Sequence, residues 1–156
     1  NLTASLVEAG EISPSAFSLS VFNTPIALLS IAEKNTEGSV VLNAGPASFQ
    51  TALWEALALR EHSGDPEVLM IAADEMIPAP FDRLAPQGSV PHALGLLLGA
   101  GPGGGAVRLE LGMDFGQGGP PEDAREPSAL RFLRWFLGDR LRPLSLGQAE
   151  LICPGC

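Results

Sequence analysis

Apolar residues form two kinds of run along this chain. Residues 47–60 are apolar on nearly every face of a helix, so we expect a helix that is buried on most sides. Residues 68–73 form a continuous apolar run, typical of a parallel strand covered on both faces. A short β-branched strand at 39–43 precedes the helix and completes a strand–helix–strand unit with a right-handed crossover. The pattern predicts an α/β domain in which strands 39–43 and 67–73 are parallel neighbours and helix 47–60 packs between layers.

Shorter patterns predict the remaining elements. Apolar periodicity indicates three more helices, at 1–10, 17–33 (interrupted by Pro25) and 128–138. Alternating or continuous apolar runs indicate three more strands, at 92–98, 106–113 and 146–152. Proline- and glycine-rich loops are expected at 78–91, 99–105 and 114–127.

Composition limits the classes of function. The chain has 156 residues, 46% of them apolar, so we expect one globular domain over residues 1–156. The net charge is −9 and Lys34 is the single lysine, which argues against binding nucleic acid or anionic membranes. No apolar run is long enough for a membrane span and no secretory signal is visible, so we expect a cytoplasmic protein. Because the chain begins at Asn1 rather than Met, we expect an upstream segment to be missing.

Charged and thiol groups offer few candidates for chemistry. Several arginines gather near the end of the chain: Arg125, Arg131, Arg134, Arg140 and Arg142. They could bind an acidic partner, but we favour the interpretation that they form a solvated helix face. Cys153 and Cys156 have the CxxC spacing of a redox pair or half a zinc site, but no second pair and no suitably spaced histidine accompany them. We therefore expect two incidental thiols. The glycine-rich stretch 99–105 lacks the Lys-Ser/Thr of a phosphate loop, and we expect no metal and no cofactor.

A series of motifs carries a resemblance to a known family. In chain order they are Phe22-Asn23-Thr24-Pro25-Ile26-Ala27 with Ser30-Ile31, Val40 to Ser48 leading into a helix to Arg60, Val68 to Glu75, Pro80-Phe81-Asp82, Gly88, and Ala93 to Leu98. Their order and spacing over residues 13–112 resemble the β-ketoacyl-synthase-like N-terminal domain of the thiolase fold. The resemblance implies a layered α/β/α architecture, here an incomplete half, with a mixed, mostly parallel sheet and a buried central helix.

The same resemblance locates a missing nucleophile. In the family, a cysteine at the start of the buried helix accepts the acyl chain, and the helix dipole activates its thiolate. Pro46 occupies that position here, and an alignment shifted by a residue or two places Gly45, Ala44 or Ala47 there; none of these can be acylated. No histidine follows His92, whereas the family has two catalytic histidines in its second half. The family is one of acyltransferases, yet we expect no independent condensing activity from this chain.

These departures imply a non-catalytic subunit of the chain-length-factor type. Such subunits pair with an active ketosynthase in fatty-acid, polyketide or aryl-polyene-type biosynthesis, and a homodimer and an acyl carrier protein contact are the other partners that the resemblance allows. The expected interface is formed by Phe22, Val40, Val41 and Leu42, because the strand before the nucleophile turn lies at the dimer seam in this family.

Two polar residues keep other roles open. An acyl or acyl-carrier binding module, or a degenerate decarboxylase, is the alternative function. A decarboxylase needs an oxyanion hole more than a thiol, and Gln50, one turn beyond Pro46, is the candidate donor. The plainer interpretation of Gln50 is a polar residue that faces a neighbouring helix. Glu75 follows a strand end, where active-site groups often lie, but we favour a buried structural acid.

Overall fold

The computed structural model describes residues 7–8, 10–11, 13–63, 67–85, 88–99, 110–113, 126–138, 142–146 and 149–153, without the side chains of 63, 111–113 and 149. Everything below concerns these residues. Several predicted segments lie outside them in whole or in part: most of helix 1–10, the turn 99–105 beyond Gly99, the first half of strand 106–113, most of loop 114–127, and Cys156. The chain divides into two units, Asn1–Asn43 and Ala44–Cys156, which are described separately.

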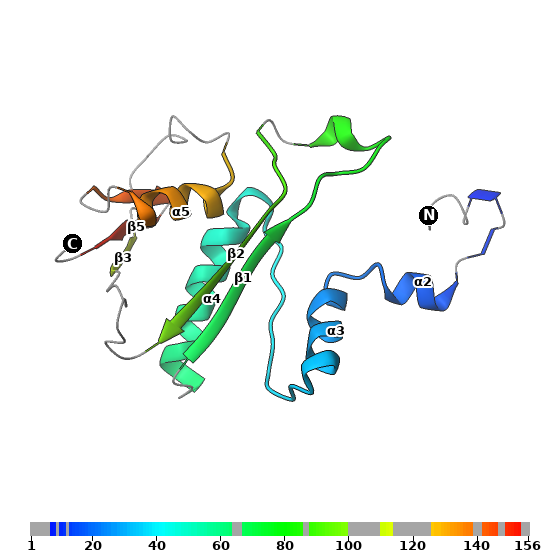
Figure 1. Cartoon of the computed structure of the whole chain (residues 1–156), viewed down its shortest axis with the longest axis horizontal. Helices are drawn as coiled ribbons and strands as arrows, with labels where there is room; N and C mark the ends of the chain where they lie inside the picture. Colours follow the sequence, from blue (N-terminus) through cyan, green and yellow to red (C-terminus); the bar gives the residue numbers. More distant parts are fainter. Residues whose placement is uncertain are drawn as a thin grey trace. The chain divides into compact units, whose positions relative to one another are not determined.

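The first unit contains two helices, α2 (Pro14–Ser18) and α3 (Thr24–Glu33). The prediction of a single helix over 17–33 is wrong, because the chain forms two separate helices. Pro25 does not interrupt a helix but lies in the first turn of α3, where the proline nitrogen would have no hydrogen-bond partner in the helix in any case. Lys34 ends α3 in the left-handed conformation, with φ 53°. Figure 1 shows the two helices as separate segments joined by a short connection.

The predicted strand at 39–43 is absent. Residues 39–43 adopt no regular structure and belong to neither sheet. A strand is stable only beside another strand, and neither sheet of the described chain includes this segment as a neighbour. The predicted parallel pairing with 67–73 and the right-handed crossover are therefore wrong for this structure.

The second unit begins with a 3-10 turn, η1 (Gly45–Ala47), that leads directly into α4 (Ser48–Ser63). Strand β1 (Glu67–Asp74) follows, and a connection containing the 3-10 turn η2 (Asp82–Leu84) leads to β2 (His92–Gly99). β1 and β2 pair antiparallel over their whole length, from Glu67 opposite Gly99 to Asp74 opposite His92. A parallel pair needs a long crossover, usually a helix, and no helix is described in this connection, which returns the chain antiparallel.

A second small sheet has the order β3–β5–β4. β3 (Glu110–Met113) and β4 (Leu144–Leu146) both pair antiparallel with β5 (Ala149–Ile152). The sequence predicted one strand over 146–152, but the structure has a pair of strands in this region. The mostly parallel sheet of the sequence-based prediction is thus replaced by two small antiparallel sheets.

Helix α5 (Ser128–Leu137) packs beside α4 and contributes to the core (Figure 1). Its Arg131 is 7% exposed and donates a hydrogen bond from a terminal guanidinium nitrogen to the Ser145 carbonyl at 2.8 Å. Trp135 donates from Nε1 to the Arg142 carbonyl at 2.6 Å. The expectation that the arginines form a solvated helix face is wrong for Arg131, because this side chain fixes α5 to β4.

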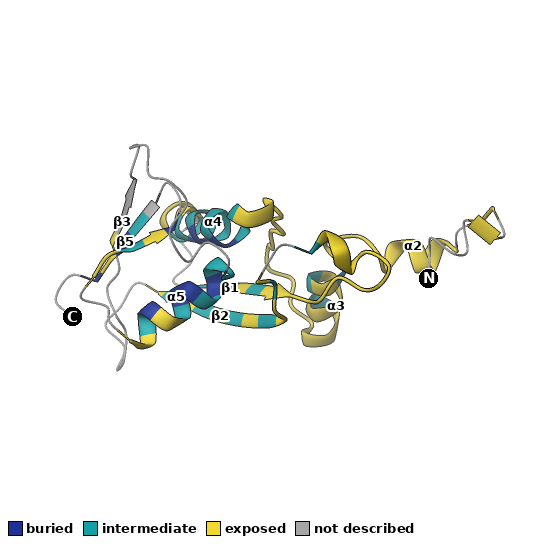
Figure 2. Cartoon of the chain, turned by 90° about the horizontal axis from the view of Figure 1, so that it is seen from above, coloured by how far each residue is buried: buried dark blue, intermediate teal, exposed yellow. Residues whose placement is uncertain are grey.

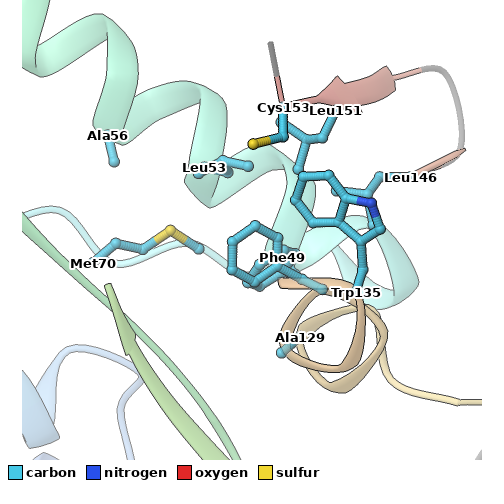
Figure 3. Close-up of a cluster of buried hydrophobic side chains, with 10 residues drawn as sticks. Phe49, Leu53, Ala56, Met70, Ala129, Trp135, Leu146, Leu151 and Cys153 are labelled. Carbon is cyan, nitrogen blue, oxygen red and sulfur yellow. The ribbon is translucent and has the colours of Figure 1, made fainter. Parts of the chain in front are cut away.

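The core forms where α4, α5, β1 and the second sheet meet (Figure 3). Phe132 is its centre, with ring centroids 5.4 Å from Phe49, 5.9 Å from Trp135 and 5.7 Å from Phe136. The buried apolar residues are Phe49, Leu53, Ala56, Met70, Ala129, Phe132, Trp135, Leu146, Leu151 and Cys153. Within α4 the buried residues are Phe49, Leu53 and Ala56, which form one stripe at the i, i+4, i+7 spacing. Helix α4 therefore buries one face, and most residues on its other faces are half-buried.

Cys153 lies in this core and is disulfide-bonded. The expectation of an incidental free thiol is therefore wrong for Cys153. Cys156, the other cysteine of the CxxC motif, lies outside the described residues.

Candidate functional site

The turn that opens α4 is the site to which the sequence motifs lead. Gly45 has φ +57°, a left-handed conformation that favours glycine. The Ala47 N–H donates to the Ala44 carbonyl at 3.2 Å, which closes the 3-10 turn, and Pro46 lies within that turn. Pro46 is exposed at the start of the helix, so the position expected for a nucleophile carries a ring with no reactive group.

Ser48 carries the hydroxyl group of this turn, and its Oγ atom forms hydrogen bonds with the backbone of the turn. It donates to the Gly45 carbonyl at 2.7 Å and accepts from the Ala44 N–H at 2.9 Å. A hydroxyl that donates and accepts in this way acts as a clasp for the turn, and both partners are backbone atoms. No structural role was predicted for Ser48 from the sequence, although serine is a preferred residue at helix starts.

Neither histidine hydrogen-bonds to the turn. His62 lies in the last turn of α4, and its Nδ1 is 2.9 Å from the Ala58 carbonyl oxygen. The Nδ1 atom of His92 is 2.9 Å from the Val90 carbonyl oxygen. The described residues therefore provide no histidine that is hydrogen-bonded to the Ser48 hydroxyl. Within the same residues, no group of three or more His, Cys, Asp or Glu side chains is placed to hold a metal ion.

Gln50 and Glu75 are placed differently. Gln50 lies in the first turn of α4 and is half-buried. Glu75 follows β1 directly and is exposed, so the expected burial of this acid is not seen. A half-open pocket of about 290 Å³ lies elsewhere, and its lining includes none of the predicted site residues: Gly88, Val90, Glu126, Pro127, Leu130 and Arg134.

The residues predicted for an interface are all on the surface of the first unit. Phe22 is 75% exposed, Val40 53%, Val41 42% and Leu42 38%. No described residue of this unit is buried; Thr24, Ile26 and Ser30 are half-buried and the others are exposed. Helix α3 is mostly apolar, and its Leu28, Leu29 and Ile31 side chains are exposed, a pattern that soluble proteins normally cover. The first unit therefore has no core of its own among the described residues.

The structure defines a domain of mixed helices and strands whose α4 begins at a tight turn with proline at the position of the expected nucleophile. Comparison places this domain in a family. The sequence model of "Beta-ketoacyl synthase, N-terminal domain" matches residues 1–144, so the chain belongs to that family. The resemblance inferred from the motifs is thereby confirmed.

A solved structure supports the same fold. The chain is similar to one in the structure of the ketosynthase ApeO in complex with its chain length factor ApeC from Xenorhabdus doucetiae, with a TM-score of 0.72 and 28% sequence identity. The alignment covers 96% of this chain and 60% of that chain, so this chain spans less than two thirds of its length. The fold is thus similar to the ketosynthase, thiolase-like fold. No curated protein matches the chain.

Within the ranges that the structure describes, no helix is both long enough and apolar enough to cross a bilayer.

Proposed function

We propose that this chain is a non-catalytic β-ketoacyl-synthase-like subunit of the chain-length-factor type, which pairs with an active ketosynthase in fatty-acid, polyketide or aryl-polyene-type biosynthesis. The observation that carries the proposal is the α4 turn. A condensing enzyme needs a thiolate here, and this turn presents Pro46, with the nearby Ser48 hydroxyl committed to backbone hydrogen bonds.

The exposed apolar surface of the first unit supports the pairing part of the proposal. Phe22, Val41 and the mostly apolar helix α3 expose large apolar side chains that a soluble monomer normally hides. The ten residues of α3 form a helix too short to be stable in water without tertiary packing. We therefore propose that residues 17–43 become buried against the partner ketosynthase, and that this burial stabilises the unit.

The similar structure is consistent with such a pairing, because it is that of a ketosynthase in complex with its chain length factor. This chain would correspond to the chain length factor in the proposed complex, since the acylation chemistry is missing from its α4 turn.

The test is co-purification with the ketosynthase encoded nearest to this gene, read by light scattering. Val41→Lys places a charge in the proposed seam and is expected to abolish the complex, because an unpaired buried charge is strongly destabilising. Val90→Lys is the matched control, since Val90 is 44% exposed and Val41 is 42% exposed. The control variant should still co-purify. A wild-type chain that stays monomeric beside that ketosynthase at high concentration would refute the pairing.

A further inference from the structure

Helices α2 and α3 differ from the helices of the second unit in how they are held. Neither α2 nor α3 has a buried residue, whereas α4 and α5 each bury part of their surface (Figure 2). Hydrogen bonds within residues 13–43 join near neighbours in the chain. The Thr24 hydroxyl donates to the Ser18 carbonyl at 2.7 Å, and the Asn35 N–H donates to the Ser30 carbonyl at 2.8 Å. Local interactions are therefore the main support of these two helices.

Helices of this length and composition are unstable when they stand alone. α2 has five residues and α3 has ten, both fewer than the roughly 12–15 residues at which isolated helices become marginally stable. Asn23 forms no side-chain capping hydrogen bond at the start of α3, and no acidic residue lies in its first turn. Ile26 and Ile31 are β-branched, which lowers helix propensity further. Local interactions alone leave α3 largely unfolded in water.

The end of α3 adds a further cost. Lys34 has φ 53°, which is the left-handed conformation. A residue with a Cβ atom is disfavoured in this conformation, and glycine is the usual residue at such a helix end. The Lys34 N–H donates to the Ile31 carbonyl at 3.3 Å, so the last turn of the helix extends to this residue. Any interaction that stabilises α3 must also offset the strain at Lys34.

We propose that residues 13–43 are unfolded in the free chain and fold into α2 and α3 when they bind the partner ketosynthase. This inference rests on the proposed function and adds that pairing and folding are a single event. Burial of the apolar side chains of α3 against the partner supplies the stabilisation that the helices lack by themselves. The cost of ordering the segment is subtracted from the affinity, so the dissociation constant depends on how readily α3 folds.

Helix α4 provides an internal reference for the test. It buries Phe49, Leu53 and Ala56 in the core of the second unit, so it is folded with or without a partner. A substitution that weakens α4 therefore changes the stability of the second unit. The same substitution in α3 changes the affinity for the partner instead.

Hydrogen exchange followed by mass spectrometry tests the free state of the full chain. Without a partner, peptides from residues 13–43 should exchange as fast as an unfolded chain, whereas peptides from α4 should be protected. After addition of the ketosynthase encoded nearest to this gene, exchange in peptides covering α3 should slow by about tenfold or more. Exchange in α4 should stay slow in both states.

Variants at the end of α3 test the link between folding and affinity. Lys34→Gly relieves the left-handed conformation, and Lys34→Ala removes the same charge but keeps a Cβ atom at this position. The dissociation constant of the complex should be about fivefold lower for Lys34→Gly than for Lys34→Ala. The comparison of these two variants cancels the effect of losing the lysine charge.

A matched pair of glycine substitutions tests the same link in the opposite direction. Ala27→Gly should raise the dissociation constant about fivefold, because glycine is unfavourable in a helix interior. Ala58→Gly is the control, since Ala58 is exposed on α4 as Ala27 is on α3. The control should lower the free energy of unfolding of the second unit and leave the dissociation constant unchanged.

Two results would overturn the coupled folding and leave the proposed pairing intact. Protection of α3 in the free chain, comparable to that of α4, would show that the helix is folded before it meets a partner. A Lys34→Gly variant that binds no more tightly than Lys34→Ala would show that folding of α3 is no part of the binding equilibrium. A wild-type chain that forms no complex with the ketosynthase refutes the pairing itself, and the coupled folding with it.

Discussion

Leu53→Ala tests the packing of α4 more directly than any other single change. Leu53 is 2% exposed and belongs to the buried stripe of this helix (Figure 3). The substitution removes three buried carbon atoms, at about 0.8 kcal/mol for each buried CH₂ group. The residual cavity adds a further cost, so we expect a loss of about 3 kcal/mol in the free energy of unfolding.

Leu57→Ala is the matched control, because Leu57 lies on the same helix one turn further on and is only half-buried. We expect it to cost about half as much as Leu53→Ala, since part of its surface already contacts water. The measurement is urea unfolding followed by circular dichroism at low protein concentration, with the slope against denaturant compared between variants. A loss below about 1 kcal/mol at Leu53, or equal losses at the two positions, would show that α4 buries a different face.

Three further predictions follow from the described contacts. Ser48→Ala should lower the free energy of unfolding by about 1 kcal/mol, because the Oγ atom closes the α4 turn; no loss in urea unfolding would contradict the clasp. Given malonyl-carrier and an acyl primer, the purified chain should form no acyl adduct on the α4 turn, and a stable adduct on Ser48 in mass spectrometry would overturn the non-catalytic proposal. Arg131→Ala should lower the free energy of unfolding by about 2 kcal/mol or more, because it removes a buried side chain that is hydrogen-bonded to the Ser145 carbonyl. Arg134→Ala should change it by less than about 0.5 kcal/mol, because Arg134 pairs with Glu126 at the surface. Equal effects of the two substitutions in thermal unfolding would argue against this difference.

Local patterns predicted several elements well. The apolar run at 47–60 corresponds to α4, and the runs at 68–73 and 92–98 correspond to β1 and β2 within a residue or two at each end. The helix predicted at 128–138 is α5. These patterns succeed because the period of apolar residues reflects which face of an element is covered.

The pairing of strands was predicted wrongly. A continuous apolar strand such as 68–73 indicates cover on two faces, but the sequence does not show what provides that cover. Here α4 covers one face of β1, and the other face is exposed. The antiparallel direction depends on the connection between β1 and β2, which contains a 3-10 turn rather than a helix.

The sequence located the candidate site, and the structure revealed the hydrogen bonds of its side chains. The order of motifs placed the nucleophile position at Pro46, and the structure has a tight turn there. The two hydrogen bonds of Ser48 were not predicted, because they depend on the backbone path of residues 44–48 rather than on residue type. The exposure of Glu75 was likewise invisible in the sequence, because burial depends on what packs around a strand end.

By itself, the sequence determined the family, the positions of the principal helices and strands, and the absence of a thiol at the α4 turn, because these depend on residue identity and local periodicity. The tertiary structure alone decided the strand directions, the hydrogen bonds of the Ser48 hydroxyl and the exposure of Glu75. The strand directions depend on contacts between segments distant in the chain, and many arrangements of such segments satisfy the same local pattern. The Ser48 hydrogen bonds depend on the backbone path of residues 44–48, which residue types alone do not determine.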